Sequence, residues 1–132
     1  MRQIQFVSNN DIQLLESGLA LFPALLSAID SAQHDVYFET YIWACDDAGN
    51  AVEEALIRAA ERGVKVRVVA DWWGTGYRGC TRLGIAFAKA GVRYRVFNPW
   101  FKRGVTRTHR KIAVIDREVA FVGGINCNDD WY

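Results

Sequence analysis

Two segments of helix length each end in a glycine, and a short β-branched strand follows each glycine directly. Residues 51–63 (AVEEALIRAAERG) precede VKVRVVAD at 64–71, and residues 80–91 (CTRLGIAFAKAG) precede VRYRVFN at 92–98. A glycine just past a helix ends it readily, because it adopts the left-handed backbone conformation at little cost. Helices of about a dozen residues that alternate with strands predict an α/β layer fold with parallel strand pairs.

The remaining segments add further strands and one helix. Residues 11–17 alternate weakly and indicate a short strand, and Pro23 suits the first turn of a helix, where its missing N–H is not needed. The aromatic and β-branched segment 34–44 (HDVYFETYIWA) indicates a central strand, and segments 111–116 and 119–124 indicate a hairpin. The expected fold is a mixed, largely parallel sheet flanked by helices.

Length and composition limit the function classes. The chain has 132 residues, with 16 basic and 15 acidic side chains, so we expect one domain over residues 1–132. Near-neutral charge argues against a protein that holds nucleic acid by bulk electrostatics, although it leaves room for a local basic patch. No apolar run reaches the roughly 20 residues of a membrane span, so membrane contact would be peripheral. Cys45, Cys80 and Cys127 lack paired or zinc-ligand spacing and indicate reduced thiols.

One stretch, THRKIAVIDREVAFVGGIN, carries the candidate chemistry. Side chains repeat with period two in a strand, so His109 and Lys111 are predicted to share a face. A lysine that binds the oxygens of an anion beside an imidazole that attacks it or shuttles a proton suits a phosphodiester substrate. Simple hairpin register would return Asn126, just after Gly124, beside His109. Asp116 opens the turn at an odd offset, which favours a structural turn residue over a catalytic one.

The spacing of these residues resembles a known family signature. His109, Lys111, Asp116, Gly124 and Asn126 follow the pattern of the HKD motif of the phospholipase D superfamily. Further segments extend the resemblance, over most of the chain, to the amino-terminal half of a bacterial cardiolipin synthase: IQLLESG, FPALLSAIDSAQ, FETYIW and AAERGVKVRVVAD.

This resemblance implies a mechanism without a metal or another cofactor. His109 would attack the phosphorus to form a phosphohistidine, Lys111 and Asn126 would hold the phosphoryl oxygens, and Asp116 would belong to the catalytic motif. A second histidine, from a second motif, would protonate the leaving alcohol. The implied enzyme moves a phosphatidyl group from an anionic, phosphatidylglycerol-like phospholipid to a hydroxyl of another lipid. It would work in the cytoplasm, peripheral to the inner membrane of a bacterium.

The chain departs from the family pattern in two ways. It carries one motif, and the other histidine, His34, is followed by a different sequence. The second motif would then come from a homodimer partner or from a missing segment. The chain also ends 23 residues after His109, whereas the family usually continues through another strand and helix that carry a carboxylate orienting the histidine. Asp129 and Asp130 come too early for that part, so we expect a truncated domain.

Other residues are candidates for substrate binding. Glu39 lies in an aromatic strand and needs a partner if buried, and Arg107 or a group near the site is expected to supply it. Trp72 belongs to WWGTGYRG, a predicted loop after the strand that Asp71 ends, and either lines a lipid pocket or packs in the core. The loop 98–107 mixes aromatic and basic residues and suits an anionic lipid interface, a single-stranded nucleic acid or plain solvent.

Three functions remain open at this stage. The leading one is a half-domain of a cardiolipin synthase-like phosphatidyltransferase. The second is a homodimeric phosphodiesterase or nuclease of the same superfamily, which would hydrolyse its substrate. The third is an inactive fragment that binds anionic lipid or a partner. We expect nucleic acid to be an unlikely partner under the leading hypothesis.

Overall fold

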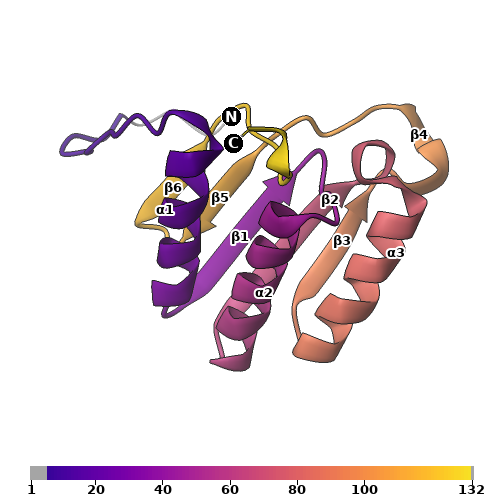
Figure 1. Ribbon diagram of the computed structural model, residues 1–132, viewed down its shortest axis with the longest axis horizontal. Helices are drawn as coiled ribbons and strands as arrows, with labels where there is room; N and C mark the ends of the chain where they lie inside the picture. Colours follow the sequence, from indigo (N-terminus) through magenta and orange to yellow (C-terminus); the bar gives the residue numbers. More distant parts are fainter. Residues whose placement is uncertain (1–5, 132) are drawn as a thin grey trace.

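A computed structural model describes residues 6–131, which form three α-helices and a five-stranded sheet (Figure 1). The elements are α1 Ser17–Ser31, β1 Asp35–Thr40, α2 Asp47–Glu61, β2 Lys65–Asp71, α3 Trp72–Ala90, β3 Arg93–Phe97, η1 Pro99–Phe101, β4 Lys102–Val105, β5 Ile112–Ile115, β6 Val119–Val122 and η2 Asp129–Trp131. The strand order in the sheet is β3-β2-β1-β5-β6.

The sheet is mixed, as predicted. β1, β2 and β3 are parallel, whereas β5 runs antiparallel to both β1 and β6. The predicted hairpin of β5 and β6 is confirmed, and it turns through Asp116 and Arg117, both with positive φ. Antiparallel pairing also joins β5 to β1, so two of the four strand pairs are antiparallel, more than the sequence pattern predicts. The reason is that β5 enters the sheet from the edge where β1 ends.

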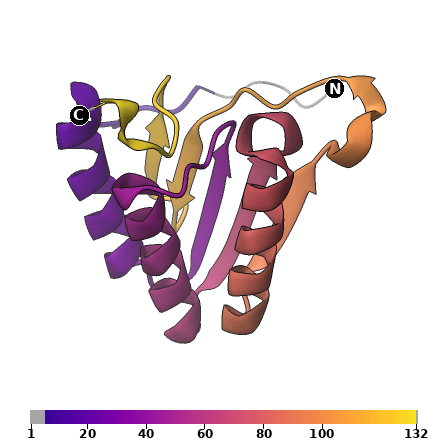
Figure 2. The same ribbon diagram turned by 45° about the vertical axis from the view of Figure 1, so that its right-hand side comes forward.

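All three α-helices cover the same face of the sheet (Figures 1 and 2). Alternate strand residues, such as Val36, Val68 and Ala113, are buried in one core together with residues of the helices. Residues on the opposite strand face, such as Tyr37 and Arg67, are at least partly exposed. Burial of each large apolar side chain stabilises the fold by about 1.5–3 kcal/mol, so this core holds the sheet that positions the site.

The first helix corrects two predictions. Residues 11–16 form no strand, and α1 begins at Ser17, so Pro23 lies inside the helix and not in its first turn. The alternation upstream has nothing to pack against, since Ile12 and Leu14 are 90% and 81% exposed. Proline inside a helix removes one backbone hydrogen bond, and the buried face of α1, with Phe22, Leu25 and Ile29, offsets part of that cost.

The other two helices begin earlier than predicted but end where expected. Asp46 caps α2, so residues 47–50, which precede the predicted helix at 51–63, form the first turn of this helix. Asp71 caps α3, so the predicted loop after β2 is helical, with a break at Gly76. Caps of this kind favour a helix start by about 1 kcal/mol. Gly63 and Gly91 follow the two helices with positive φ, as predicted.

Candidate active site

The candidate site lies at one edge of the sheet. β5 runs antiparallel to β1, and Ile112 at its start pairs with Glu39 near the end of β1. The segment between β4 and β5 crosses the carboxyl ends of the parallel strands to reach this position (Figure 1). Loops at this edge of an α/β sheet usually carry the functional residues. His109, three residues before Ile112, therefore lies where ligands are expected.

His109 and Lys111 contact each other, as their spacing predicts. The Lys111 Nζ lies 3.0 Å from Nδ1 and 3.2 Å from Nε2 of His109, and it donates to the His109 carbonyl oxygen at 2.9 Å. The imidazole is exposed, whereas Lys111 is 9% exposed, and burial lowers the pKa of its ammonium. A cation held against an exposed imidazole would meet any anion that reaches the ring.

Tyr41 completes this cluster, and the sequence analysis missed it. Its ring centroid lies 4.6 Å from that of His109, and the Lys111 Nζ lies 5.4 Å from the Tyr41 ring centroid. Tyr41 follows Glu39 by two residues just past the end of β1. Its position two residues after Glu39 could have indicated it, because alternate residues of an extended segment share a side.

A buried carboxylate fixes the backbone next to His109. Asp71 is 1% exposed, and its Oδ2 accepts a hydrogen bond from the Thr108 N–H at 2.8 Å. Its other oxygen accepts from two backbone N–H groups in the first turn of α3. The Thr108 hydroxyl donates to the Glu39 carboxylate. The residue before His109 is thus tied to the ends of both β1 and β2.

Glu39 has a basic partner other than Arg107. Its carboxylate lies 3.5 Å from Nη1 of Arg110, whereas the Arg107 guanidinium lies over the Trp73 ring, 4.6 Å from its centroid. Of the two expected kinds of partner, the structure shows a group near the site, Arg110, and not Arg107. The physical reason is the clamp at Thr108, which turns the chain so that the residue two positions later, Arg110, faces the strand.

Asn126 and Gly124 lie on the segment after β6. The Asn126 side-chain oxygen accepts a hydrogen bond from the Ile42 N–H at 3.2 Å, so Asn126 lies beside the residue that follows Tyr41. Gly124 is exposed, and a Cβ added to it would meet no atom within 4 Å. Both residues border the edge that carries His109, and their roles toward a substrate remain predictions.

Asp116 lies at the opposite end of β5 from His109. Its carboxylate accepts backbone hydrogen bonds from Gln33, His34 and Asp35 at 2.8–2.9 Å. These bonds, first those from Gln33 and Asp35, lower the pKa of the carboxyl. The contacts match the interpretation as a turn residue that caps backbone N–H groups. They also place His34 at the far edge, away from the imidazole of His109.

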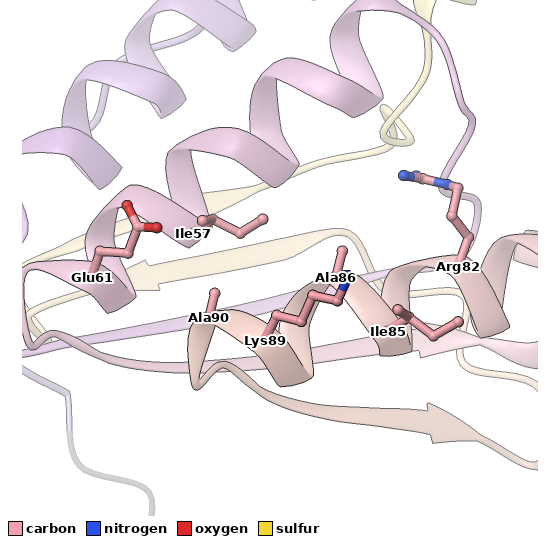
Figure 3. A pocket seen from close by; sticks show the side chains of 7 residues that line it. All are labelled: Ile57, Glu61, Arg82, Ile85, Ala86, Lys89 and Ala90. Atoms are coloured by element: carbon pink, nitrogen blue, oxygen red, sulfur yellow. The ribbon is translucent and has the colours of Figure 1, made fainter.

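Two of the hollows on the described surface have linings that do not include His109. A groove of about 460 Å³ runs between α2 and α3, with Ile57 and Glu61 on one wall and Arg82 on the other (Figure 3). A hollow of about 470 Å³ lies on the uncovered face of the sheet and includes Glu39 and Ile112 in its lining. The contacts at His109 therefore define the site better than the hollows do.

Trp72, a predicted substrate-binding residue, packs within an aromatic cluster next to the site. Its ring lies 4.7 Å from Trp100 and 5.7 Å from Tyr77, measured between centroids. Within residues 6–131, no cluster of three or more histidine, cysteine, aspartate or glutamate side chains could hold a metal ion. The described helices include none that is long and apolar enough to cross a bilayer.

Comparison with known proteins places this arrangement in a family. Residues 25–130 match the family described as "Cardiolipin synthase, PLD-like domain". The chain is 41% identical over 124 residues to cardiolipin synthase B of Escherichia coli (strain K12), which covers 89% of this chain and 30% of that protein. It is 35% identical over 125 residues to cardiolipin synthase 1 of Bacillus cereus, covering 90% and 24% of the two proteins.

A solved structure shows the same fold. The phospholipase D family member Nuc from Salmonella typhimurium aligns with a TM-score of 0.65 and 26% identity, over 80% of this chain and 64% of Nuc. The chain spans about a third or less of the curated synthases that it matches. Family match, sequence identity and fold agree, so the chain belongs to the phospholipase D-like domain family that includes the cardiolipin synthases.

Proposed function

We propose that this chain supplies one half of the active site of a cardiolipin synthase-like phosphatidyltransferase. The observation that carries the proposal is the contact of the Lys111 Nζ with both ring nitrogens of the exposed His109. This contact holds a cation against the ring, where it would meet the phosphoryl oxygens of a substrate that the imidazole attacks. The 41% identity to a cardiolipin synthase favours an anionic phospholipid as the substrate.

The reaction would proceed in two displacements. A ring nitrogen of His109 bonds to the phosphorus of a phosphodiester, and the bond from phosphorus to the leaving alcohol breaks. A histidine of the second motif gives that alcohol its proton. A hydroxyl of a second lipid then attacks phosphorus and returns a proton to the second histidine, while the nitrogen–phosphorus bond breaks and frees His109.

The residues around His109 have separate parts in this proposal. Lys111 and Asn126 would stabilise the charge that develops on the phosphoryl oxygens. Tyr41 would hold the plane of the imidazole by ring contact, and Asp71 would fix the backbone through Thr108. Asp116 would act at a distance, by fixing the hairpin that carries the motif. A second motif would come from another copy of the chain or from another segment of a longer protein.

A substrate with a good leaving group tests the half-site alone. In a phosphatidyl ester of p-nitrophenol, the leaving phenolate needs no proton, so the second histidine is not required for the first step. We expect one equivalent of nitrophenolate and an acid-labile phosphorus label on the protein. The label should vanish in His109→Ala and persist in His34→Ala, the matched control at the far edge. Label that does not depend on His109 would refute the proposal.

Product analysis then identifies the reaction class. With phosphatidylglycerol and a preparation that contains both motifs, cardiolipin dependent on His109 is expected. Phosphatidic acid as the sole product dependent on His109 would mean hydrolysis in place of transfer, and it would favour the phosphodiesterase alternative.

A further inference from the structure

A group of aromatic side chains, of which Trp72 is half-buried and the others are exposed, lies at the same edge of the sheet as His109. Its members, which we call the aromatic patch, are Trp72, Trp73, Tyr77, Trp100 and Phe101. Ring contacts join them into two groups, with centroids 4.7 Å apart for Trp72 and Trp100, which Tyr77 also contacts, and 5.2 Å apart for Trp73 and Phe101. Trp73, Tyr77 and Trp100 remain 54%, 57% and 65% exposed. A contiguous exposed apolar surface of this kind marks an interaction site.

The segment that presents two of the five members of the aromatic patch is held in an unfavourable backbone conformation. Asn98, Trp100 and Phe101 have φ angles of 48°, 57° and 53°, a region that side chains other than glycine rarely adopt. The side chain of Asn98 stabilises the segment: its amide donates to two carbonyl oxygens at 2.8 Å, and its oxygen accepts from the Arg103 N–H. Burial of Trp100 in the core does not explain this strain, since its side chain remains 65% exposed.

The charge around the aromatic patch is strongly one-sided. Residues 72–115 contain no aspartate or glutamate, yet they contain ten of the 16 lysines and arginines of the chain. Lys102 and Arg103 follow the patch directly and are exposed, and the Arg107 guanidinium lies over the Trp73 ring. The near-neutral net charge of the whole chain conceals this basic segment.

We propose that the aromatic patch, with Lys102, Arg103 and Arg107, docks the chain on an anionic lipid bilayer. Tryptophan and tyrosine favour the region between headgroups and acyl chains, and each lysine or arginine near an anionic surface adds attraction. Arg107 lies two residues before His109, so a bilayer that touches the patch presents its phosphodiesters at the level of the imidazole. The inference deepens the proposed function, on which the choice of a lipid over other anions rests.

The ring geometry favours a bilayer over a single-stranded nucleic acid. Proteins that bind single strands offer separate aromatic platforms on which successive bases stack. Here Trp72, Trp100 and Tyr77 contact one another at interplanar angles of 44–67°, with centroids within 5.7 Å. Rings packed in this way leave no gap for a base between them. A continuous apolar surface bordered by cations suits an interface of acyl chains and anionic headgroups.

Vesicle flotation tests the docking surface without any turnover. The chain is mixed with phosphatidylcholine vesicles that contain or lack phosphatidylglycerol, at low and high salt, and its partition is measured. We expect binding to the anionic vesicles that weakens at high salt. Trp100→Ala with Phe101→Ala should reduce the partition by about tenfold. Lys102→Gln with Arg103→Gln should reduce it by about fivefold for each charge, on anionic vesicles alone.

Control variants change exposed apolar and basic side chains elsewhere. Ile85→Ala with Val119→Ala removes apolar side chains that are 57% and 47% exposed, and Lys65→Gln with Lys89→Gln removes two charges. Both control variants should partition within about twofold of the unchanged chain. Equal losses in patch and control variants would overturn the proposal. Binding to a single-stranded oligonucleotide but not to vesicles would also overturn it and assign the surface to nucleic acid.

These experiments distinguish a failure of the docking proposal from a failure of the proposed catalytic function. The His109→Ala chain should still float with anionic vesicles, because flotation needs no chemistry. If patch variants lose flotation while the nitrophenyl ester shows no reaction dependent on His109, docking stands and the proposed function fails. If that reaction occurs while patch variants float unchanged, the docking surface alone is refuted.

Discussion

The Asp71 carboxylate links the start of α3 to Thr108, the residue before the candidate nucleophile His109. Substitutions of Asp71 can remove the contact with Thr108 and the helix cap separately. One carboxylate oxygen accepts from the Thr108 N–H, and the other caps α3. In Asp71→Asn, the amide oxygen still caps the helix, but an NH₂ group faces the Thr108 N–H. Both groups are buried, so the variant leaves one backbone donor without an acceptor.

The magnitude follows from these contacts. An unsatisfied buried N–H costs about 1–3 kcal/mol, and we expect Asp71→Asn to lower the free energy of unfolding by that amount. Asp71→Ala also loses the helix cap, which adds about 1 kcal/mol. Asp71→Ala should therefore be the least stable of the three proteins, Asp71→Asn should be intermediate, and the unchanged chain should be the most stable. For a domain of this size, each kcal/mol lowers the melting temperature by about 4 °C.

Urea unfolding followed by circular dichroism measures these differences. Asp30→Asn is the matched control, because its exposed ion pair with Arg58 should contribute at most about 1 kcal/mol. The transition slope should stay constant, so that a shift of the midpoint reports stability alone. If Asp71→Asn is as stable as Asp30→Asn, the clamp on Thr108 contributes nothing and the reasoning is wrong.

Three other substitutions test single contacts. Gly74→Ala should destabilise the chain, because its Cβ would lie 2.3 Å from the Tyr41 carbonyl oxygen; Gly124→Ala, with open space around its Cβ, should leave thermal stability unchanged. Asp116→Asn should destabilise the chain near neutral pH, because the pKa of this carboxyl is lower in the folded chain than its ordinary 3.8. The stability difference from the unchanged chain should shrink as the pH falls below about 4. Thermal melts over a pH series measure this difference, and a constant difference would contradict the prediction. Asp129→Ala should destabilise by about 1–2 kcal/mol in urea unfolding, because its carboxylate accepts from two backbone N–H groups at the start of α2; an unchanged midpoint would contradict this.

Local patterns predicted much of the fold. The strands β2 and β3, the hairpin after Lys111 and both glycine-ended helices were predicted from composition and periodicity. Helix starts were predicted less well, since Asp46 and Asp71 could equally open a turn. The false strand at 11–17 shows the limit of alternation, because a strand needs a neighbour and these residues have none.

In the candidate site, too, the sequence predicted the contacts between near neighbours and missed those between distant residues. Spacing alone predicted that His109 and Lys111 share a side, because that relation depends on two residues of extended chain. Tyr41 and the Asp71–Thr108 clamp join residues 37 to 68 positions apart, and no local pattern encodes such a distance. For the same reason, the sequence left the partner of Glu39 open between Arg107 and a group near the site, and the structure shows Arg110.

What the sequence by itself determined is the alternation of helices and strands and the spacing of the motif, since both depend on neighbours along the chain. The tertiary structure decided which residues meet. The crossing from β4 to β5 brings Arg107 onto Trp73 and Thr108 onto Asp71, whereas the length of β5 carries Asp116 to the far edge. A strand separates its two ends by about 3.3 Å per residue, so residues of one short motif lie at opposite edges of the sheet.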